Sequence, residues 1–283
     1  MRAMLLMGLV ACTKAPPVVA TPDATPEGAV LAEVPVHPTY DAATFYEMTT
    51  AWGGAFNHDG TKLLITSDAS GVFNAVAVAT DGSGSVALTT STTDSRMGLT
   101  WFPSDDRFLV SGDVAGNERS HVFVMGPDAE PVDLTPGDET RASFRGWNGD
   151  RTAFFVATNE RDPQSMDVYV YTLDEGYPRT LLFENTEAWQ VGPISPDGRY
   201  VALSRPNSNV DDDLFLFDAE AGGEPTHLTP HEGEVSYGLD DFAPDGSALW
   251  YTSDAGEEWT AAYRYDLQTG EHTREIEEPW DVW

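Results

Sequence analysis

The sequence predicts an all-β protein built from repeated four-stranded units, the blades of a β-propeller. Three observations support this prediction: helix-period patterns are nearly absent, short apolar runs alternate with turn residues, and one motif recurs along the chain. The 283 residues include 25 glycines and 19 prolines, as expected for a chain rich in turns. A hydrophobic fraction of 41% allows a sizeable core in one large domain or two small ones.

One motif occurs five times, with an apolar residue, two spacers, an aspartate, a small or polar residue and then an apolar run. The copy at positions 242–254 reads FAPDGSALWYTSD. The aspartates of the five copies are Asp59, Asp105, Asp150, Asp197 and Asp245, at intervals of 46, 45, 47 and 48 residues. A period of this length in an all-β chain is typical of propeller blades.

Each repeat is predicted to form four strands. Small residues before the motif suit an innermost strand, and the apolar run after it suits a second strand with both faces buried. An alternating third strand and a short polar outer strand follow, and the polar outer edge opposes aggregation. The predicted repeats lie near residues 52–95, 96–140, 141–187, 188–234 and 235–279. The WDVW segment at 280–283 is predicted to begin a sixth blade, in a ring that is incomplete.

The motif itself predicts the tight turn between the first two strands of each blade. Aspartate accepts backbone hydrogen bonds in such a turn, and glycine adopts a left-handed backbone conformation at little cost. The residues assigned to these turns are Asp59, Gly60, Asp105, Asp106, Asp150, Asp197, Gly198, Asp245 and Gly246.

The charge is strongly negative, with 47 acidic against 15 basic side chains and a formal net charge of −32. Such a surface repels phosphate backbones and anionic lipid headgroups, which argues against a nucleic-acid partner. Two explanations stay open: an acidic but otherwise ordinary soluble surface, or adaptation to a saline environment in which salt screens the self-repulsion.

The N-terminus resembles a bacterial lipoprotein signal. A short apolar run leads to Leu9-Val10-Ala11-Cys12, which resembles a lipobox, where the cysteine becomes the diacylated mature N-terminus. We predict a signal peptide at residues 1–11, lipid on Cys12, a Pro- and Ala-rich tether at 12–40 and the propeller at 41–283. The alternative is a buried or incidental cysteine. A lipid anchor implies the cell envelope, and Thr13 after the cysteine resembles lipoproteins sorted to the outer membrane, on its periplasmic side.

With the repeats laid out, the chain resembles the propeller of bacterial prolyl oligopeptidase family members, of the dipeptidyl-peptidase and acylaminoacyl-peptidase kind. The stretches that carry the resemblance include ATNERDPQSMDVYVYTLDEG at 157–176 and LTPHEGEVSYGLDDFAPDGSALWYTSD at 228–254. The Pro-Asp-Gly repeat is shared with TolB-like propellers. In the peptidases, the resemblance implies a propeller that filters substrates by size for a following α/β-hydrolase domain.

The catalytic signature of that family is missing. A nucleophile elbow needs Gly-x-Ser-x-Gly, because only small flanking residues allow its strained turn, and this string does not occur in the 283 residues. We therefore expect the chain alone to be inactive, with no catalytic residues, no metal site and no cofactor. The chain ends in EEPWDVW, which leads us to expect the hydrolase domain on a separate chain or in a lost part of the gene.

Two functions are consistent with these observations. The first is the substrate-gating propeller of a prolyl-oligopeptidase-type serine peptidase, present without its catalytic domain. The alternative is a non-enzymatic, TolB-like propeller lipoprotein that binds protein partners in the cell envelope. The expected partners are a peptide or protein ligand, a separate hydrolase domain, or a second copy of the chain. The membrane is expected to be contacted through the lipid anchor alone.

Several other features are assigned structural roles. Arg161 is a candidate to face the central pore and meet a peptide terminus, although a salt bridge is the favoured interpretation. The acidic run NVDDD at 209–213 lacks the glycine and distal glutamate of a calcium loop and predicts a hairpin turn. His227 and His231 lie four residues apart in a turn-containing segment, so a metal site is not expected there. Core packing is predicted for Trp52, Trp101, Trp147, Trp189 and Trp250, with the central funnel as the alternative for some of them.

Overall fold

The computed structural model describes residues 39–127, 129–255 and 257–283, and it divides into two units at Met48 and Thr49. The described part of the first unit contains one short helix, α1 (Ala42–Tyr46), which begins at Asp41, whose carboxylate accepts a hydrogen bond from the Thr44 amide at 2.9 Å. The predicted signal peptide and Cys12 lie outside the described residues. No helix within the described ranges is long and apolar enough to span a bilayer.

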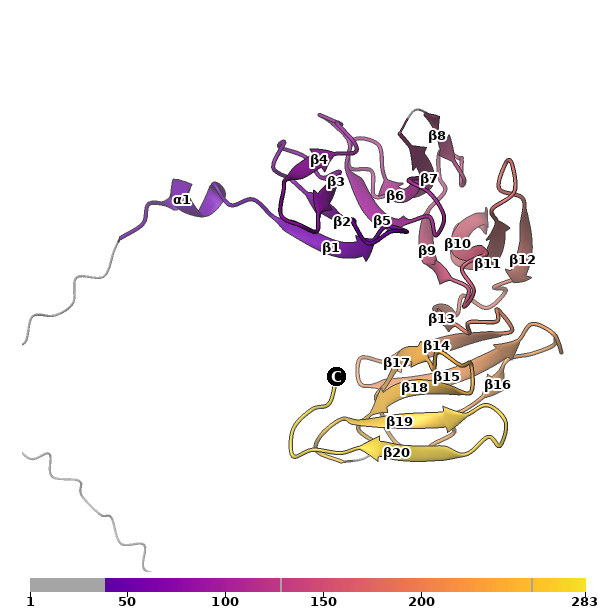
Figure 1. Ribbon diagram of the computed structural model, residues 1–283. Helices are drawn as coiled ribbons and strands as arrows, with labels where there is room; N and C mark the ends of the chain where they lie inside the picture. Colours follow the sequence, from indigo (N-terminus) through magenta and orange to yellow (C-terminus); the bar gives the residue numbers. More distant parts are fainter. Residues whose placement is uncertain (1–38, 128, 256) are drawn as a thin grey trace, which may run out of the picture. The chain divides into compact units, whose positions relative to one another are not determined.

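The second unit, Thr49–Trp283, consists of five antiparallel sheets of four strands each (Figure 1). The first sheet is β1 (Ala51–Phe56), β2 (Lys62–Ser67), β3 (Asn74–Ala79) and β4 (Ser85–Ala87). The second is β5 (Arg96–Trp101), β6 (Phe108–Gly112), β7 (His121–Gly126) and β8 (Ala129–Asp133). The third is β9 (Ala142–Trp147), β10 (Ala153–Asp162), β11 (Ser165–Thr172) and β12 (Arg179–Phe183). The fourth is β13 (Gln190–Ile194), β14 (Tyr200–Ser208), β15 (Asp211–Asp218) and β16 (Thr226–His227). The fifth is β17 (Tyr237–Phe242), β18 (Ala248–Ser253), β19 (Ala261–Asp266) and β20 (His272–Ile276).

The repeated motif forms the turn between the first two strands of every sheet. In the first sheet, Asp59 accepts a hydrogen bond from the Thr61 amide at 2.9 Å, and Gly60 has φ +73°. Each of the other four aspartates accepts from the amide two residues later at 2.9–3.1 Å; the pairs are Asp105–Arg107, Asp150–Thr152, Asp197–Arg199 and Asp245–Ser247. Gly198 and Gly246 also have positive φ, whereas the third repeat places Arg151 in this conformation. The motif therefore recurs because each sheet needs the same turn.

Side chains alternate between the two faces of each strand, so every sheet has two faces that can pack against a neighbour. Hydrophobic clusters on these faces join consecutive sheets. We call the face that packs on the next sheet in chain order the forward face, and the opposite one the rear face. Leu64 and Ala77 on the forward face of the first sheet pack against Trp101 and Val110 on the rear face of the second. Corresponding clusters join the second sheet to the third, the third to the fourth and the fourth to the fifth.

Two glycines on innermost strands allow neighbouring sheets to approach closely. A Cβ atom at Gly98 would lie 2.9 Å from the Leu64 side chain of the preceding sheet. At Gly192 it would lie 2.5 Å from Leu239 of the following sheet and 2.9 Å from the Ala202 carbonyl oxygen. These contacts explain why small residues precede the motif in the sequence.

The five sheets are not closed into a ring, so the predicted five blades and incomplete ring are confirmed. The predicted strand of a sixth blade, in contrast, is not formed: residues 277–283 contain no strand. Asp281 instead accepts hydrogen bonds from the amide and hydroxyl of Thr260 at 3.0 and 2.7 Å, and the Val282 amide donates to the Thr260 carbonyl at 3.0 Å. The segment is held against the start of β19 and pairs with no sheet edge.

Candidate functional site

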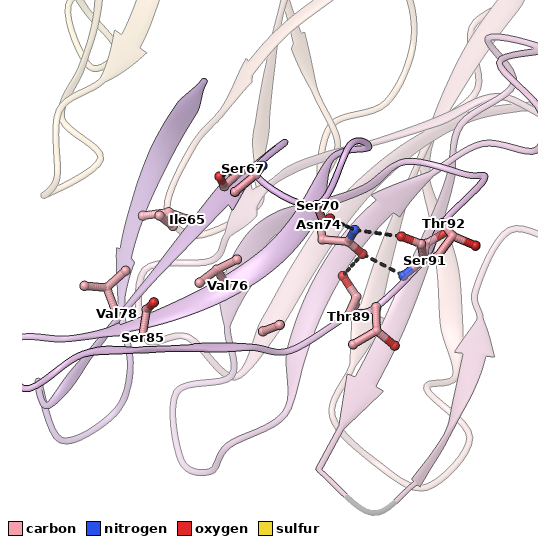
Figure 2. A pocket seen from close by; sticks show the side chains of 13 residues that line it. Ile65, Ser67, Ser70, Asn74, Val76, Val78, Ser85, Thr89, Ser91 and Thr92 are labelled. Carbon is pink, nitrogen blue, oxygen red and sulfur yellow. Dashed lines mark hydrogen bonds between the residues drawn. The ribbon is translucent and has the colours of Figure 1, made fainter. Parts of the chain in front are cut away.

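The rear face of the first sheet carries an open pocket with a volume of about 540 Å³ (Figure 2). Ile65 of β2 pairs with Val76 of β3, and Val76 pairs with Ala87 of β4, so these side chains form one row on this face. Val78 belongs to the neighbouring row and also lines the pocket. The lining contains no charged residue. The pocket therefore offers an apolar sheet surface and no ionic recognition.

Asn74 fixes the polar end of this pocket (Figure 2). Its side-chain amide nitrogen donates to the Ser70 hydroxyl and the Ser91 carbonyl, both at 2.9 Å. Its side-chain oxygen accepts from the Thr89 hydroxyl and the Ser91 amide, also at 2.9 Å. Because these bonds use both donors and both acceptors of its side chain, Asn74 needs no ligand to satisfy its hydrogen bonding. The chemistry of the pocket thus favours an apolar occupant.

Arg145 is a second notable feature, on the innermost strand of the third sheet. One guanidinium nitrogen donates to the carbonyls of Val191 and Gly192 at 2.6 and 2.7 Å. Within the residues that the structure describes, its Nε atom is buried without a partner and no carboxylate lies within ion-pair distance of the guanidinium. Burial lowers the pKa of this guanidinium, which still remains protonated. The residue links the innermost strands of two sheets by satisfying carbonyls at the edge of β13.

Arg161 lies in a salt bridge, the interpretation that the sequence favoured. Its guanidinium donates two hydrogen bonds to the Asp167 carboxylate, both at 2.7 Å, and a third to the Asn185 carbonyl at 2.8 Å. Asp167 is fully buried and also accepts from the Asn185 amide at 2.8 Å. The hydrogen bonds that Arg161 donates to the Asp167 carboxylate raise the pKa of Arg161 above its ordinary value. The Arg161 nitrogens that face Asp167 are both used in hydrogen bonds within the third sheet. We therefore assign Arg161 the role of holding this sheet together.

Among the turn residues, Asp106 forms an ion pair with a neighbouring sheet: its carboxylate contacts the Lys62 ammonium at 2.8 Å. This contact connects the first and second sheets beside their shared cluster. Both side chains are more than a third exposed, so its contribution to stability is expected to be small.

The NVDDD run and the two histidines are brought together in the fourth sheet. His227 contacts Asp213 at 2.7 Å, and His231 contacts Asp211 at 2.8 Å. Each of these carboxylates is thereby paired with an imidazole. Within the described ranges, no group of three or more side chains is arranged to hold a metal ion. The run lies in the β14–β15 hairpin and at the start of β15.

The His231 contacts predict a pH dependence of stability. Its Nδ1 contacts the Thr229 carbonyl and its Nε2 contacts Asp211, both at 2.8 Å, so both ring nitrogens face acceptors. These two contacts raise the pKa of His231, with the carbonyl as the larger cause. The folded state thus favours the protonated ring. The resulting stabilisation is fully present below the unfolded pKa of about 6.5 and is lost as pH rises through the higher folded pKa.

Thermal melts of the wild type and of His231→Gln at about pH 6 and at about pH 8.5 would measure this effect. We expect the wild type to exceed the variant in Tm by more at the lower pH. Burial lowers the pKa of His272, which makes stability depend on pH in the opposite direction. Both proteins contain His272, so the Tm difference between the wild type and the variant cancels its contribution. A Tm difference that does not change with pH would contradict the assignment.

The rear-face pocket and Arg145 were not identified as site residues from the sequence. A sequence signal for the pocket is found in the third strand of each sheet, where the size of the rear-face side chains differs. The second sheet places Phe123 and Met125 on its rear face, where they pack against the first sheet. The first sheet has Val76 and Val78 instead, which leaves room for the pocket. No sequence signal distinguishes Arg145, because its partners are backbone carbonyls of a strand that lies far away in the chain.

The fold and the repeats define a β-propeller, and comparison with known proteins agrees. No family model matches the chain. Its sequence is 27% identical over 226 residues to dipeptidyl aminopeptidase BIII of Pseudoxanthomonas mexicana, a match that covers 78% of this chain and 32% of that protein. The chain therefore corresponds to about a third of the length of this relative.

Solved structures resemble the chain in fold. Prolyl oligopeptidase B from Galerina marginata aligns with a TM-score of 0.59 and 11% identity, over 78% of this chain and 33% of that one. A TolB-type protein from Agrobacterium tumefaciens aligns with a TM-score of 0.50 and 17% identity, over 80% of both chains. The resemblance to TolB-like propellers and to those of the prolyl oligopeptidase family, first indicated by the repeats, is confirmed.

Proposed function

We propose that this chain is an exported, lipid-anchored propeller that controls the access of peptides to a serine peptidase of the prolyl oligopeptidase type. The observation that carries the proposal is the 27% identity to dipeptidyl aminopeptidase BIII over 226 residues. This similarity supports more than a shared fold, because it extends over most of the chain and comes from sequence. The hydrolase domain would lie in a further part of the polypeptide or on a separate chain.

The surface charge is compatible with this role. A net charge of −32 opposes binding of nucleic acids and anionic lipids and favours approach by neutral or basic peptides. The alternative, a non-enzymatic TolB-like lipoprotein, is supported by likeness of fold alone, and fold does not determine function. We therefore rank it second.

Reconstitution tests the proposal. The reading frame that follows this chain in the genome is expected to encode a Gly-x-Ser-x-Gly hydrolase domain. Co-expression of this hydrolase domain with the chain should give cleavage of dipeptidyl p-nitroanilides and exclude larger peptides. The hydrolase domain expressed alone should also cleave larger peptides, because no propeller then restricts their access. An unrelated frame downstream, or a hydrolase whose size selectivity is unchanged by the chain, would favour the TolB-like alternative.

The chain by itself is expected to be inert toward a fluorophosphonate probe. Such probes react with a serine whose proton is removed by a nearby base. In the described part of the chain, no serine hydroxyl is hydrogen-bonded to a histidine. Intact-mass spectrometry after incubation should show no added phosphonate, with a known serine peptidase as the positive control. Stoichiometric labelling of one serine would reveal a nucleophile arrangement that the sequence does not indicate.

The lipid anchor predicts covalent modification of Cys12. Cells expressing the wild type and supplied with a clickable palmitate should give a labelled band, and Cys12→Ser should abolish the label. The reason is chemical: the diacylglyceryl group is transferred to a thiol, and this chain contains one cysteine. Cys12→Ser should also move the protein from the membrane fraction to the soluble fraction. An unlabelled wild type, or label that persists in the variant, would refute the anchor.

A further inference from the structure

Within the described ranges, no sheet packs on the rear face of the first sheet, which is built like the faces that pack between sheets elsewhere in the chain. The row of Ile65, Val76 and Ala87 is apolar, and no charged side chain lines the pocket above it. On the rear face of the second sheet, Phe123 and Met125 contact the forward face of the first. The first sheet thus presents a surface that, in every later sheet, is covered by a neighbouring sheet.

Within the described ranges, no sheet packs on the forward face of the last sheet either, and Trp250 is the largest side chain on it. Trp250 follows its turn aspartate by five residues, the same spacing as Leu64, Phe155 and Ala202 in three other repeats. Those three residues are at most 2% exposed, because the next sheet packs on each of them. Trp250 is only partly buried and does not belong to the cluster between the fourth and fifth sheets. Within the described ranges, no sixth sheet follows to cover it.

We propose that two copies of the 283-residue chain associate, with the forward face of the last sheet in one copy packed on the rear face of the first sheet in the other and the Trp250 indole in the pocket formed by Ile65, Val76 and Val78. By position, the two surfaces correspond to the two halves of the contact that each copy makes four times internally. The neighbour of Trp250 on β19 is Arg264, at the position where the covered forward faces carry Ala77, Val170 and Leu216. A contact between two different surfaces is heterologous, and it generates closed rings or open chains of copies.

Electrostatics allows this contact at the interface but opposes it at long range. The pocket has no charged lining residue, and Arg264, which is paired with Trp250 across β18 and β19, is neutralised by Asp266 at 2.9 Å. Two chains of net charge −32 nevertheless repel each other. Salt screens that repulsion without weakening apolar contact, so association is expected to increase with ionic strength.

The occupant is a second copy rather than a small polar ligand, for a reason visible in the pocket. Asn74 at its rim has all its hydrogen bonds made within the chain (Figure 2). In the described part of the chain, five residues have a buried side-chain atom that lacks a partner, and none of the five lines the pocket: Asn57, Trp101, Asp106, Arg145 and Thr158. An apolar surface lined by no buried, unpaired polar atom suits an aromatic side chain on another sheet.

Sedimentation equilibrium of the unlipidated full chain, at about 0.05 M and about 1 M NaCl, tests the proposal. We expect the mass of the 30.8 kDa monomer at low salt and a weight-average mass of at least twice that value at high salt. Val76→Asp and Trp250→Glu should each remain monomeric at high salt, because each destroys one half of the contact. Val86→Asp is the matched control, since Val86 lies on the opposite face of the same sheet and is 67% exposed.

Mixing the two variants gives the decisive measurement. Trp250→Glu keeps an intact rear face and Val76→Asp an intact forward face, so an equimolar mixture should form dimers and no larger species. Circular dichroism establishes that each variant is folded, and Ala87→Glu, at an exposed pocket position, replaces Val76→Asp if that variant is not. A wild type that stays monomeric at high salt, a Trp250→Glu protein that associates like the wild type, or a mixture that stays monomeric would overturn the proposal.

Discussion

Replacing Phe154 by alanine is expected to lower the free energy of unfolding by about 4 kcal/mol. Phe154 is completely buried in the cluster between the second and third sheets. Its ring stacks on Tyr171 with centroids 5.2 Å apart and meets the edge of Trp147 at 5.4 Å. Removing the ring leaves a cavity among large aromatic side chains that cannot all move inward, and a loss of this size is a large part of the stability of a typical domain.

Urea unfolding followed by circular dichroism measures this loss, and Phe56→Ala provides the control. Phe56 is 62% exposed on β1, so its truncation is expected to change the stability by about 0.5 kcal/mol or less. The measurements belong at low salt and low concentration, where self-association does not contribute. Equal effects of the two substitutions would mean that the cluster between the second and third sheets is not a packed core.

The sequence predicts the number of sheets and the position of each turn because both are local properties repeated along the chain. Every turn needs an aspartate that accepts the amide two residues later, as Asp59 does from Thr61. The apolar run after each turn is covered on both faces wherever sheets lie on both sides, as at Phe154 and Phe155. Repetition at a fixed period makes such local signals mutually consistent.

Contacts that depend on register could not be predicted in the same way. Asn74 finds its partners at Ser70, Thr89 and Ser91, which only the pairing of β3 with its neighbours brings together. The partners of Arg145 are backbone carbonyls, which are present at every position and give no signal. The predicted sixth strand failed for a related reason: an apolar segment becomes a strand only where a sheet edge is available to pair with it.

The second large effect is expected from Asp167→Ala, which should destabilise the chain by about 2 to 3 kcal/mol. Asp167 is fully buried, and its carboxylate accepts from the buried Asn185 amide as well as from Arg161. Without the carboxylate, the Asn185 amide is left as a buried donor with no acceptor, while the Arg161 guanidinium loses both of its 2.7 Å bonds to Asp167. The cost thus comes from groups left unpaired rather than from the attraction of the original pair.

The matched control is Glu187→Ala, which removes a carboxylate that contacts Arg205 at the same distance of 2.7 Å. Both members of that pair are exposed, so solvent replaces the lost contact and the stability should change by less than about 1 kcal/mol. Adding Arg161→Ala to Asp167→Ala should then cost less than the two single effects combined, because the arginine has already lost its partner. If Asp167→Ala is no worse than Glu187→Ala in urea unfolding, Asp167 does not hold the third sheet together, and Arg161 becomes available again as a residue that meets a ligand in the pore.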